Sequence, residues 1–384
     1  MTLRLAWLRH ARPGQALRLA WLRHARSGQA LRLAWLRHAR SGQALRLAWL
    51  RHAPSGQVLA AFIAALLISS TPAHAYLRLG IRANNRTVTL KQDRLPVRYF
   101  VTNRGVSGVS AQQFRAAIER GFGAWQAVET ASVSSEFAGF ITAPPLGSDN
   151  TSVLGFHDRP DLDRVLAATL FFTDINGTVL DADIFFNTLF PWSVAAGGEA
   201  ERFDLESIAV HEIGHLFGLA HSALGETELR SGGRRVIASE AAMFPVAFSA
   251  GTVLGRELKA DDIAGISDIY PASDFRQDTG SISGTVKKEG RGIIGAHVVA
   301  FNLRTGRMVA GFSLNDEGAF TISGLEPGAH ALRIEPLDDG DLEAFFDLGA
   351  VSVDVNFRPK FHERIIVAPK GGSANNVAIT VVPK

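Results

Sequence analysis

One stretch of the chain has the hydrophobic period of an amphipathic helix. Within residues 110–128, large apolar side chains recur at intervals of four, four and three positions: Phe114, Ile118, Phe122 and Trp125. This spacing places them on one helical face. Ser110 and Gln113 match a capping box, in which the two side chains satisfy free backbone amides at the start of a helix. The sequence therefore predicts a helix over 110–128 with a buried aromatic face.

Other apolar runs predict strands. Residues 165–173 and 178–187 are rich in β-branched and aromatic side chains, and Asn176-Gly177 between them is a strong hairpin signal. After residue 280, short alternating runs are separated by turn residues, at 280–286, 296–301, 318–322, 330–334 and 377–382. This pattern is typical of a β-sandwich, and the polar stretch 271–279 is the expected boundary before it.

The amino-terminal residues form a tandem repeat. Four nearly identical copies of a fourteen-residue unit, beginning Leu-Arg-Leu-Ala-Trp-Leu-Arg-His-Ala, occupy residues 3–58. Such close identity indicates duplication, and an amphipathic helix on a membrane surface is the alternative. We expect residues 1–57 to be absent from the mature protein.

The next segment has the layout of a secretory signal peptide. An apolar run of about twelve residues follows the arginines of the repeats and ends in Ala73-His74-Ala75. We therefore expect residues 58–75 to direct export and the mature chain to begin at Tyr76.

Removal of this leader would change the charge of the chain. All 37 acidic residues, but only 29 of the 40 lysines and arginines, lie after residue 75, which leaves a net charge of −8. This balance gives no support for nucleic-acid binding. The sequence contains no cysteine, so we expect neither disulfide bonds nor a lipidated cysteine as a membrane anchor. The remaining residues are enough for two domains with separate cores.

The strongest chemical signal is the string His-Glu-Ile-Gly-His-Leu-Phe-Gly-Leu-Ala-His at residues 211–221. His211 and His215 are four residues apart, so both imidazoles project from one helical face and can bind the same cation. Gly218 favours the left-handed conformation that ends a helix, and the bend can return His221 as a third ligand. Three imidazoles leave a fourth zinc position open for water, as in a catalytic site.

Glu212 directly follows the first of these histidines. From there its carboxylate can reach a metal-bound water as general base without binding the metal. Zinc would polarise the scissile carbonyl, and Glu212 would pass the proton to the leaving amine. A core helix that carries unrelated histidines is the alternative, but chance rarely fixes five such positions together.

The motif and the residues after it resemble the metzincin metalloproteases and, within them, the matrixins, the family of the matrix metalloproteinases. Ser222 directly follows the third histidine, as is typical of matrixins. Ala242-Met243-Phe244-Pro245 resembles the family's Met-turn, whose methionine lies beneath the zinc ligands and supports them. Residues 258–270 are similar to the family's closing helix.

This resemblance implies where a peptide substrate binds. The strand 165–173 would be the edge of the sheet over the cleft, and its backbone at Leu166, Ala167 and Ala168 would pair with an extended peptide. Pro245 and Val246, which follow the Met-turn methionine, would border the same substrate. An ordinary hairpin explains 165–187 equally well.

The sequence departs from the family at its other metal sites. The positions that match the histidines of a second, structural zinc look like Ala168 and Asp183, with His157 nearby. We therefore expect one catalytic Zn²⁺ and no structural zinc. Six aspartates offer oxygen ligands for Ca²⁺ but are more often turn and cap residues, so calcium is unassigned: Asp158, Asp161, Asp163, Asp174, Asp181 and Asp183.

Two further departures concern the loop and the latency mechanism. A basic stretch with Arg230, Arg234 and Arg235 separates His221 from Met243. We interpret it as a solvated loop, and a border of the specificity pocket is the alternative. Without cysteine, the cysteine-switch latency of animal matrixins is excluded.

The carboxyl-terminal residues resemble the carboxypeptidase-regulatory-like sandwich domain at three turns, which are Gly295-Ala296, residues 315–320 and residues 324–328. His297, His330 and His362 are scattered without catalytic spacing, and we interpret them as structural. Because all the zinc chemistry precedes Tyr270, we expect residues 76–273 to fold and cleave short peptides without residues 278–384.

The sequence thus predicts an α+β protein with a metzincin zinc-protease catalytic domain (76–273), built on a twisted mixed sheet with three main helices, followed by a β-sandwich (278–384). The expected function is a secreted zinc endopeptidase, extracellular or periplasmic, that acts on proteins or peptides, with a cell-surface or matrix ligand for the sandwich. A binding protein whose sandwich carries the function and whose metal site is auxiliary is the alternative. The intact Glu212 argues against it.

Overall fold

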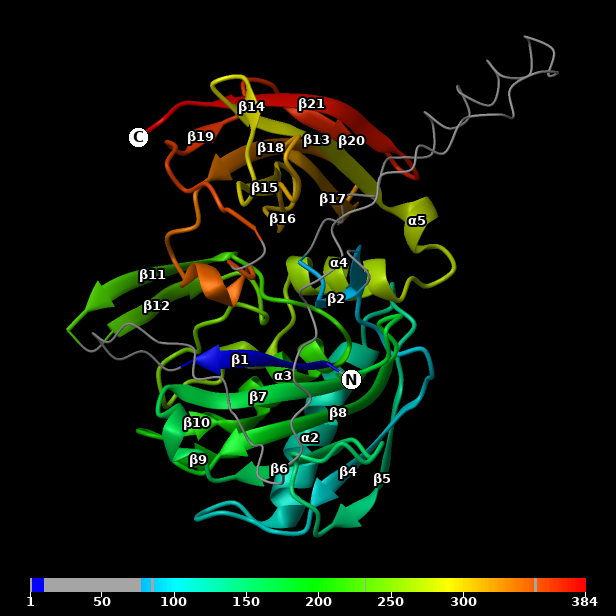
Figure 1. Ribbon diagram of the computed structural model, residues 1–384, viewed down its shortest axis with the longest axis vertical. Helices are drawn as coiled ribbons and strands as arrows, with labels where there is room; N and C mark the ends of the chain where they lie inside the picture. The colour runs from blue at the N-terminus through cyan, green and yellow to red at the C-terminus, as the bar shows by residue number, and fades with distance from the viewer. Residues whose placement is uncertain (1, 10–76, 84–85, 232, 349–350) are drawn as a thin grey trace, which may run out of the picture. The chain divides into compact units, whose positions relative to one another are not determined.

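The computed structural model describes residues 2–9, 77–83, 86–231, 233–348 and 351–384 (Figure 1). The predicted signal peptide and most of the repeats lie outside these residues, so their roles stay predictions. The described residues belong to one structural unit, with helices and a mixed sheet before residue 280 and two further sheets after it.

The first region is built on a six-stranded sheet with the order β1-β7-β8-β6-β4-β5. Its strands are β1 (Thr2–Arg9), β4 (Val97–Thr102), β5 (Ser135–Ile141), β6 (Val153–His157), β7 (Val165–Thr173) and β8 (Val179–Asn187). The pairs β4–β5, β4–β6 and β6–β8 are parallel, whereas β7 is antiparallel to both β8 and β1. The predicted hairpin is confirmed, because Gly177 takes a φ of 84° between β7 and β8.

Three main helices accompany this sheet, as predicted: α2 (Ala111–Gln126), α3 (Leu205–Leu216) and α4 (Ala260–Ile269), followed by the single turn α5 (Phe275–Asp278). The capping box of Ser110 and Gln113 is present at the start of α2. The aromatic face of α2 is buried, and the Trp125 indole Nε1 donates a hydrogen bond to the carbonyl oxygen of Val210 in α3 at 2.9 Å. This contact joins α2 to the helix that carries the histidine motif.

Shorter elements complete the first region. They are β2 (Gly80–Ala83), β3 (Arg86–Thr89), η1 (Pro160–Leu162), β9 (Trp192–Ser193), β10 (Phe203–Asp204), β11 (Gly225–Arg230), β12 (Gly233–Ser239) and η2 (Leu254–Arg256). The basic stretch after His221 is therefore a β-hairpin, β11–β12, and its prediction as a solvated loop is wrong. Gly233, with a φ of 112°, allows the tight turn between the two strands. Val236 is buried and holds the hairpin against the rest of the protein.

The second region consists of two sheets that face each other. Its elements are β13 (Gly280–Lys288), β14 (Arg291–Gly292), β15 (His297–Asn302), β16 (Met308–Phe312), β17 (Ala319–Leu325), β18 (Gly328–Glu335), η3 (Leu342–Ala344), β19 (Lys360–Phe361), β20 (Ile366–Ala368) and β21 (Ser373–Val381). One sheet has the order β14-β13-β17 with β21 against β13, and the other has the order β16-β15-β18-β19 with β20 against β18. Apolar side chains from both sheets form one core, so this region is a β-sandwich.

The sandwich also packs against the first region. Ala264 of α4 belongs to the sandwich core. Leu224 and Ala241, which flank the β11–β12 hairpin, form a buried cluster with Val299 and Ala310 of the sandwich. Apolar side chains of the two regions are therefore removed from water together.

Candidate metal centre

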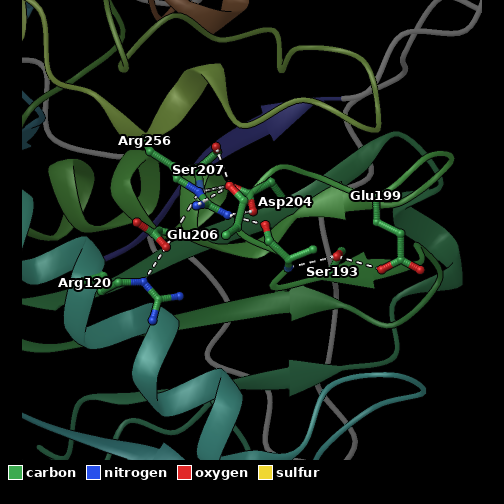
Figure 2. A network of polar contacts seen from close by, with 9 residues as sticks. Arg120, Ser193, Glu199, Asp204, Glu206, Ser207 and Arg256 are labelled. Carbon is green, nitrogen blue, oxygen red and sulfur yellow. Dashed lines mark hydrogen bonds and ion pairs between the residues drawn. The ribbon is translucent and has the colours of Figure 1, made fainter.

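Helix α3 is fixed at its amino end by ionic contacts (Figure 2). Asp204 is the N-cap, and its Oδ2 accepts hydrogen bonds from the backbone N–H and the hydroxyl of Ser207 at 2.9 and 2.6 Å. Arg256 donates to both carboxylate oxygens of Asp204, at 2.8 and 2.6 Å. Glu206 pairs with Arg120 of α2 at 2.5 Å. Because Asp204 is buried, its charge needs these partners, and together they hold the helix in place.

The first two histidines of the motif lie on one face of α3, as their spacing predicts. The ring centroids of His211 and His215 are 4.7 Å apart, and both side chains are buried. Gly214 lies between them in sequence, and a Cβ added there would be 2.3 Å from Met243 Sδ and 2.7 Å from the Trp125 ring. A glycine at 214 therefore lets the methionine and the tryptophan pack directly against the helix.

Gly218 ends the helix and turns the chain back, which confirms that prediction. Its φ is +98°, and an added Cβ would lie 2.4 Å from the carbonyl oxygen of Leu90. Any side chain at this position would therefore be strained and would also clash. Beyond the turn, the His221 ring returns to within 5.2 Å of the His211 centroid and 4.7 Å of the His215 centroid.

Each of the three histidines uses its Nδ1 in the same way. His211 donates to the carbonyl oxygen of Ala242 at 2.7 Å, His215 to that of Leu219 at 2.8 Å, and His221 to that of Ala344 at 2.7 Å. A carbonyl oxygen only accepts hydrogen bonds, so Nδ1 carries the proton, and a neutral ring then has a lone pair on Nε2. Burial lowers the pKa of His211 to about 3 and that of His215 well below its usual value, which keeps these rings neutral.

The Nε2 atoms converge on one point. The ligand atoms of the three histidines all lie within 4.8 Å of one another, and the Nε2 atoms of His215 and His221 are 3.2 Å apart. Two lone pairs this close repel each other unless a cation lies between them. The Nε2 of His211 is buried and has no hydrogen-bond partner among the described residues. This donor set fits a zinc ion with three imidazole ligands.

Glu212 directly follows His211 on α3 and is fully buried. Its Oε2 accepts a hydrogen bond from Thr169 Oγ1 at 2.7 Å, and its Oε1 has no partner among the described residues. Burial raises the pKa of Glu212 to about 8, although the hydrogen bond from Thr169 lowers it. A carboxyl group that titrates near neutral pH can accept a proton and return it.

Thr169 was not predicted from the sequence. It is a buried hydroxyl within the apolar strand β7, and such a residue needs a polar partner. A polar residue in an apolar strand was the signal that the sequence offered. Its partner on α3, Glu212, could be identified only from the fold.

Met243 packs below the motif in a tight turn. It is buried, and its backbone N–H and that of Ala242 donate to Asp262 of α4 at 3.1 and 2.8 Å. Its carbonyl oxygen accepts a hydrogen bond from the Ser222 N–H at 3.0 Å. The turn is therefore connected both to the closing helix and to the residue after His221.

A cavity adjoins His211. Its apolar lining includes Ile208, Ala242, Phe244, Val246 and Leu254. Val246 therefore borders a space next to the metal centre, whereas Pro245 is buried and is not part of the lining.

Comparison with known proteins identifies this part of the chain. Residues 91–271 match the family model of the matrixins. They form a matrixin domain. The matched range contains the three histidines, Glu212 and Met243, and it ends just after α4.

One curated relative is the metalloendoproteinase 5-MMP of Arabidopsis thaliana. It is 46% identical over 86 residues, which cover 21% of this chain and 19% of the relative. The chain thus spans about a fifth of the length of this relative, and the similarity concerns a part of each protein.

Solved structures with some likeness include a Bacillus anthracis TIE protein and a streptococcal ancillary pilin. The first is 13% identical with a TM-score of 0.19, over 28% of this chain and 17% of that one. The second is 11% identical with a TM-score of 0.17, over 56% of this chain and 47% of that one. At these TM-scores the likeness does not define a common fold.

In the full chain, strand β7 does not form the free edge of the sheet. Strand β1 pairs with it antiparallel, with Trp7 opposite Ala168 and Leu8 opposite Ala167. The side chains of Leu166, Ala167 and Ala168 are buried, so only their backbone is available to a partner strand. Strand β1 belongs to the residues that we expect to be absent from the mature protein, so the prediction of β7 as the edge strand of the mature chain stays a prediction.

Three of the aspartates considered for calcium have other contacts. Asp174 accepts backbone N–H groups of Asn176 and Thr178 within the hairpin turn, at 2.8 and 2.9 Å. Asp161 pairs with Arg159, and Asp183 accepts two backbone amides. Calcium is therefore not supported, and the histidine triad is the metal-binding group that the described residues contain.

No described helix is long and apolar enough to cross a membrane.

Proposed function

We propose that this protein is a zinc-dependent endopeptidase that hydrolyses peptide bonds. The observation that carries the proposal is the convergence of three imidazole Nε2 atoms. The helix that carries two of these rings also carries Glu212, whose buried Oε1 has no hydrogen-bond partner among the described residues. A structural zinc site would have a fourth protein ligand, whereas three ligands and an adjacent carboxylate are typical of a hydrolytic site. The matrixin domain supports a metalloendopeptidase.

His211, His215 and His221 would hold the metal through Nε2, because their Nδ1 atoms are engaged with carbonyl oxygens. When bound, zinc lowers the pKa of a water molecule and polarises a carbonyl group. Met243 supports these rings from below, since the space left by Gly214 brings its sulfur against the helix.

Glu212 would act as general base and then as general acid. Its Oε2 is held by Thr169, which leaves Oε1 to accept the proton of the attacking water. The carboxylate accepts a proton from that water and delivers it to the nitrogen of the leaving amine. The hydrogen bond from Thr169 lowers the pKa of Glu212 against the effect of burial, and a bound cation would lower it further, which favours the carboxylate that accepts the proton.

An extended peptide would bind along β7. The pairing of β1 with Leu166, Ala167 and Ala168 supports this, because it shows that the outer backbone of β7 accepts an antiparallel strand. One substrate side chain would enter the cavity beside His211, where Val246 forms part of the wall. Pro245 would contribute through the backbone of the turn.

Export and targeting are also proposals. Residues 58–75 would direct the chain out of the cytoplasm, and the substrate would be an extracellular or periplasmic protein or peptide. The residues after 75 carry a net charge of −8, which argues against a nucleic-acid substrate. The sandwich would bind a cell-surface or matrix ligand and bring the enzyme to it.

The test is the variant Glu212→Gln in the full mature chain. Glutamine keeps the shape of glutamate but cannot take up the proton, so cleavage of a quenched peptide should fall by about 10²- to 10⁴-fold. Zinc content should stay unchanged, since Glu212 is not a ligand. The matched control is Glu240→Gln, which alters an exposed glutamate and should leave cleavage unchanged. Cleavage by Glu212→Gln at the wild-type rate would contradict the assigned role.

A further inference from the structure

We propose that Ala344 of the sandwich is a positioning residue for His221, and that the segment 337–346 of the sandwich is part of the metal centre. The inference rests on the proposed zinc-binding function. It departs from the expectation that residues 76–273 alone make a complete enzyme.

The central contact is a hydrogen bond between the two regions. His221 Nδ1 donates to the carbonyl oxygen of Ala344 at 2.7 Å, across 123 positions of sequence. The other two histidines find their Nδ1 acceptors within the matrixin domain, at Ala242 and Leu219. Of the three rings, His221 is therefore the one whose tautomer and orientation depend on the sandwich. The outer partner of a metal-bound histidine fixes both properties.

The segment 337–346 is held in place by the β11–β12 hairpin. The Thr227 N–H donates to Asp339 Oδ1 at 2.7 Å, and the Thr227 hydroxyl donates to the Asp339 carbonyl oxygen at 2.9 Å. Arg234 Nη1 donates to the carbonyl oxygen of Asp338 at 2.9 Å. These bonds fix the segment just before η3, whose last residue is Ala344.

Phe345 anchors the other end of the turn. It is buried, its ring centroid is 6.1 Å from that of Phe312 and 6.4 Å from that of His221, and it belongs to an apolar cluster with Leu337. Ala223, two residues after His221, packs against the same cluster. Removal of the Phe345 ring would therefore release the carbonyl group that precedes it.

A second polar contact reaches the residue next to His221. Ser222 Oγ donates to Asp261 Oδ2 at 2.6 Å, and the Ala310 N–H of strand β16 donates to Asp261 Oδ1 at 2.8 Å. Asp261 is buried, so both bonds are shielded from water. The sandwich thus contacts His221 directly and Ser222 through one carboxylate.

The main test compares three variants of the full mature chain. Phe345→Ala should weaken zinc affinity by about 10- to 100-fold, which is the usual cost of losing an outer-shell partner. Phe345→Leu keeps an apolar anchor and should restore affinity close to wild type. Phe361→Ala removes the same ring from an exposed position of the sandwich and should have no effect. Affinity is measured by competition with a chromophoric zinc chelator.

A spectroscopic readout separates positioning from general destabilisation. In zinc-loaded protein with ¹⁵N-labelled histidine, the Nδ1–H protons of all three ligands should be protected from exchange with water. In Phe345→Ala the His221 proton should exchange fast, while those of His211 and His215 stay protected. If Phe345→Ala does not fold, Ala344→Pro carries the same test, because it removes the Ala344 N–H that bonds to Asp341 and disfavours the helical backbone at Glu343.

Wild-type affinity in folded Phe345→Ala, or equal loss of protection at all three histidines, would overturn the inference. The proposed function is judged separately, by peptide cleavage in the wild-type protein. A wild-type chain that binds zinc with three protected N–H groups but cleaves nothing would refute the enzyme and leave the role of Ala344 in place.

Discussion

Both regions of the molecule bury histidines, but within the described residues the matrixin domain alone brings them to one point. In the sandwich, His330 donates from Nδ1 to the Gly328 carbonyl oxygen at 3.0 Å, and its Nε2 faces Asn302 at 3.3 Å. His297 Nδ1 lies 3.0 Å from Glu335 Oε1. Each of these rings has a polar neighbour of its own.

The difference shows what makes a metal centre. Burial and an engaged Nδ1 occur in both regions, so neither is diagnostic. The matrixin domain adds three histidine ligand atoms within 4.8 Å of one another. On the same helix, the buried Oε1 of Glu212 has no partner among the described residues. Convergence of polar atoms that cannot satisfy one another is the feature that requires a ligand.

The largest expected effect tests this contrast directly. His215→Ala removes one of three ligands, so zinc affinity should fall by more than the roughly 100-fold that losing an outer-shell partner costs. Peptide cleavage should fall to background. His330→Ala in the sandwich should lower the melting temperature but keep zinc and cleavage. Equal zinc affinity in the two variants would remove the distinction between the regions.

A smaller effect is expected from the ion pairs. Arg256→Met leaves the buried Asp204 carboxylate without its bidentate partner, which should lower the free energy of unfolding by about 3 kcal/mol. In the sandwich, Arg307 pairs with Glu326 but is largely exposed, so Arg307→Met should cost less than about 1 kcal/mol. Urea unfolding of both variants measures the loss of unfolding free energy. Similar losses would show that the pair of Arg256 with Asp204 contributes no more than a surface ion pair.

The smallest effect concerns pH. Burial raises the pKa of Asp183 to about 8, against its usual value of 3.8. The folded state then holds a proton that the unfolded chain releases, so this group favours folding at low pH and loses its contribution as pH rises toward 8. The expected slope is at most about 1.4 kcal/mol per pH unit between pH 5 and 7.

Asp183→Asn should therefore flatten the decline of unfolding free energy between pH 5 and 7. Asp316→Asn, at an exposed position of the sandwich, is the control and should leave the slope unchanged. Parallel pH profiles for wild type and Asp183→Asn would show that the carboxyl group is already ionised in the folded protein.

The predictable parts of the fold are those with local causes. The capping box of α2, the hairpin at Gly177 and the end of α3 at Gly218 each follow from a few neighbouring residues. The convergence of His211, His215 and His221 also follows from a helix and one turn. For these features the sequence contains the whole physical reason.

The features that could not be predicted depend on contacts distant in sequence. The acceptor for His221 is a backbone carbonyl group, which every residue has, so nothing at Ala344 distinguishes it. Thr169 gains its role only when β7 packs against α3. Strand β16, in the Met308–Phe312 run, was missed because it is short and buried on both faces, which removes the alternation that marks a strand.

The most direct test of the central claim is zinc X-ray absorption on the dialysed mature protein, together with metal analysis. The account predicts about one zinc per chain, bound by three imidazole nitrogens at about 2.0–2.1 Å with one further light ligand. A reproducible value near two zinc ions would indicate a second site, for example at His157 and the nearby aspartates. A spectrum without three imidazole ligands would contradict the claim that His211, His215 and His221 together hold the metal.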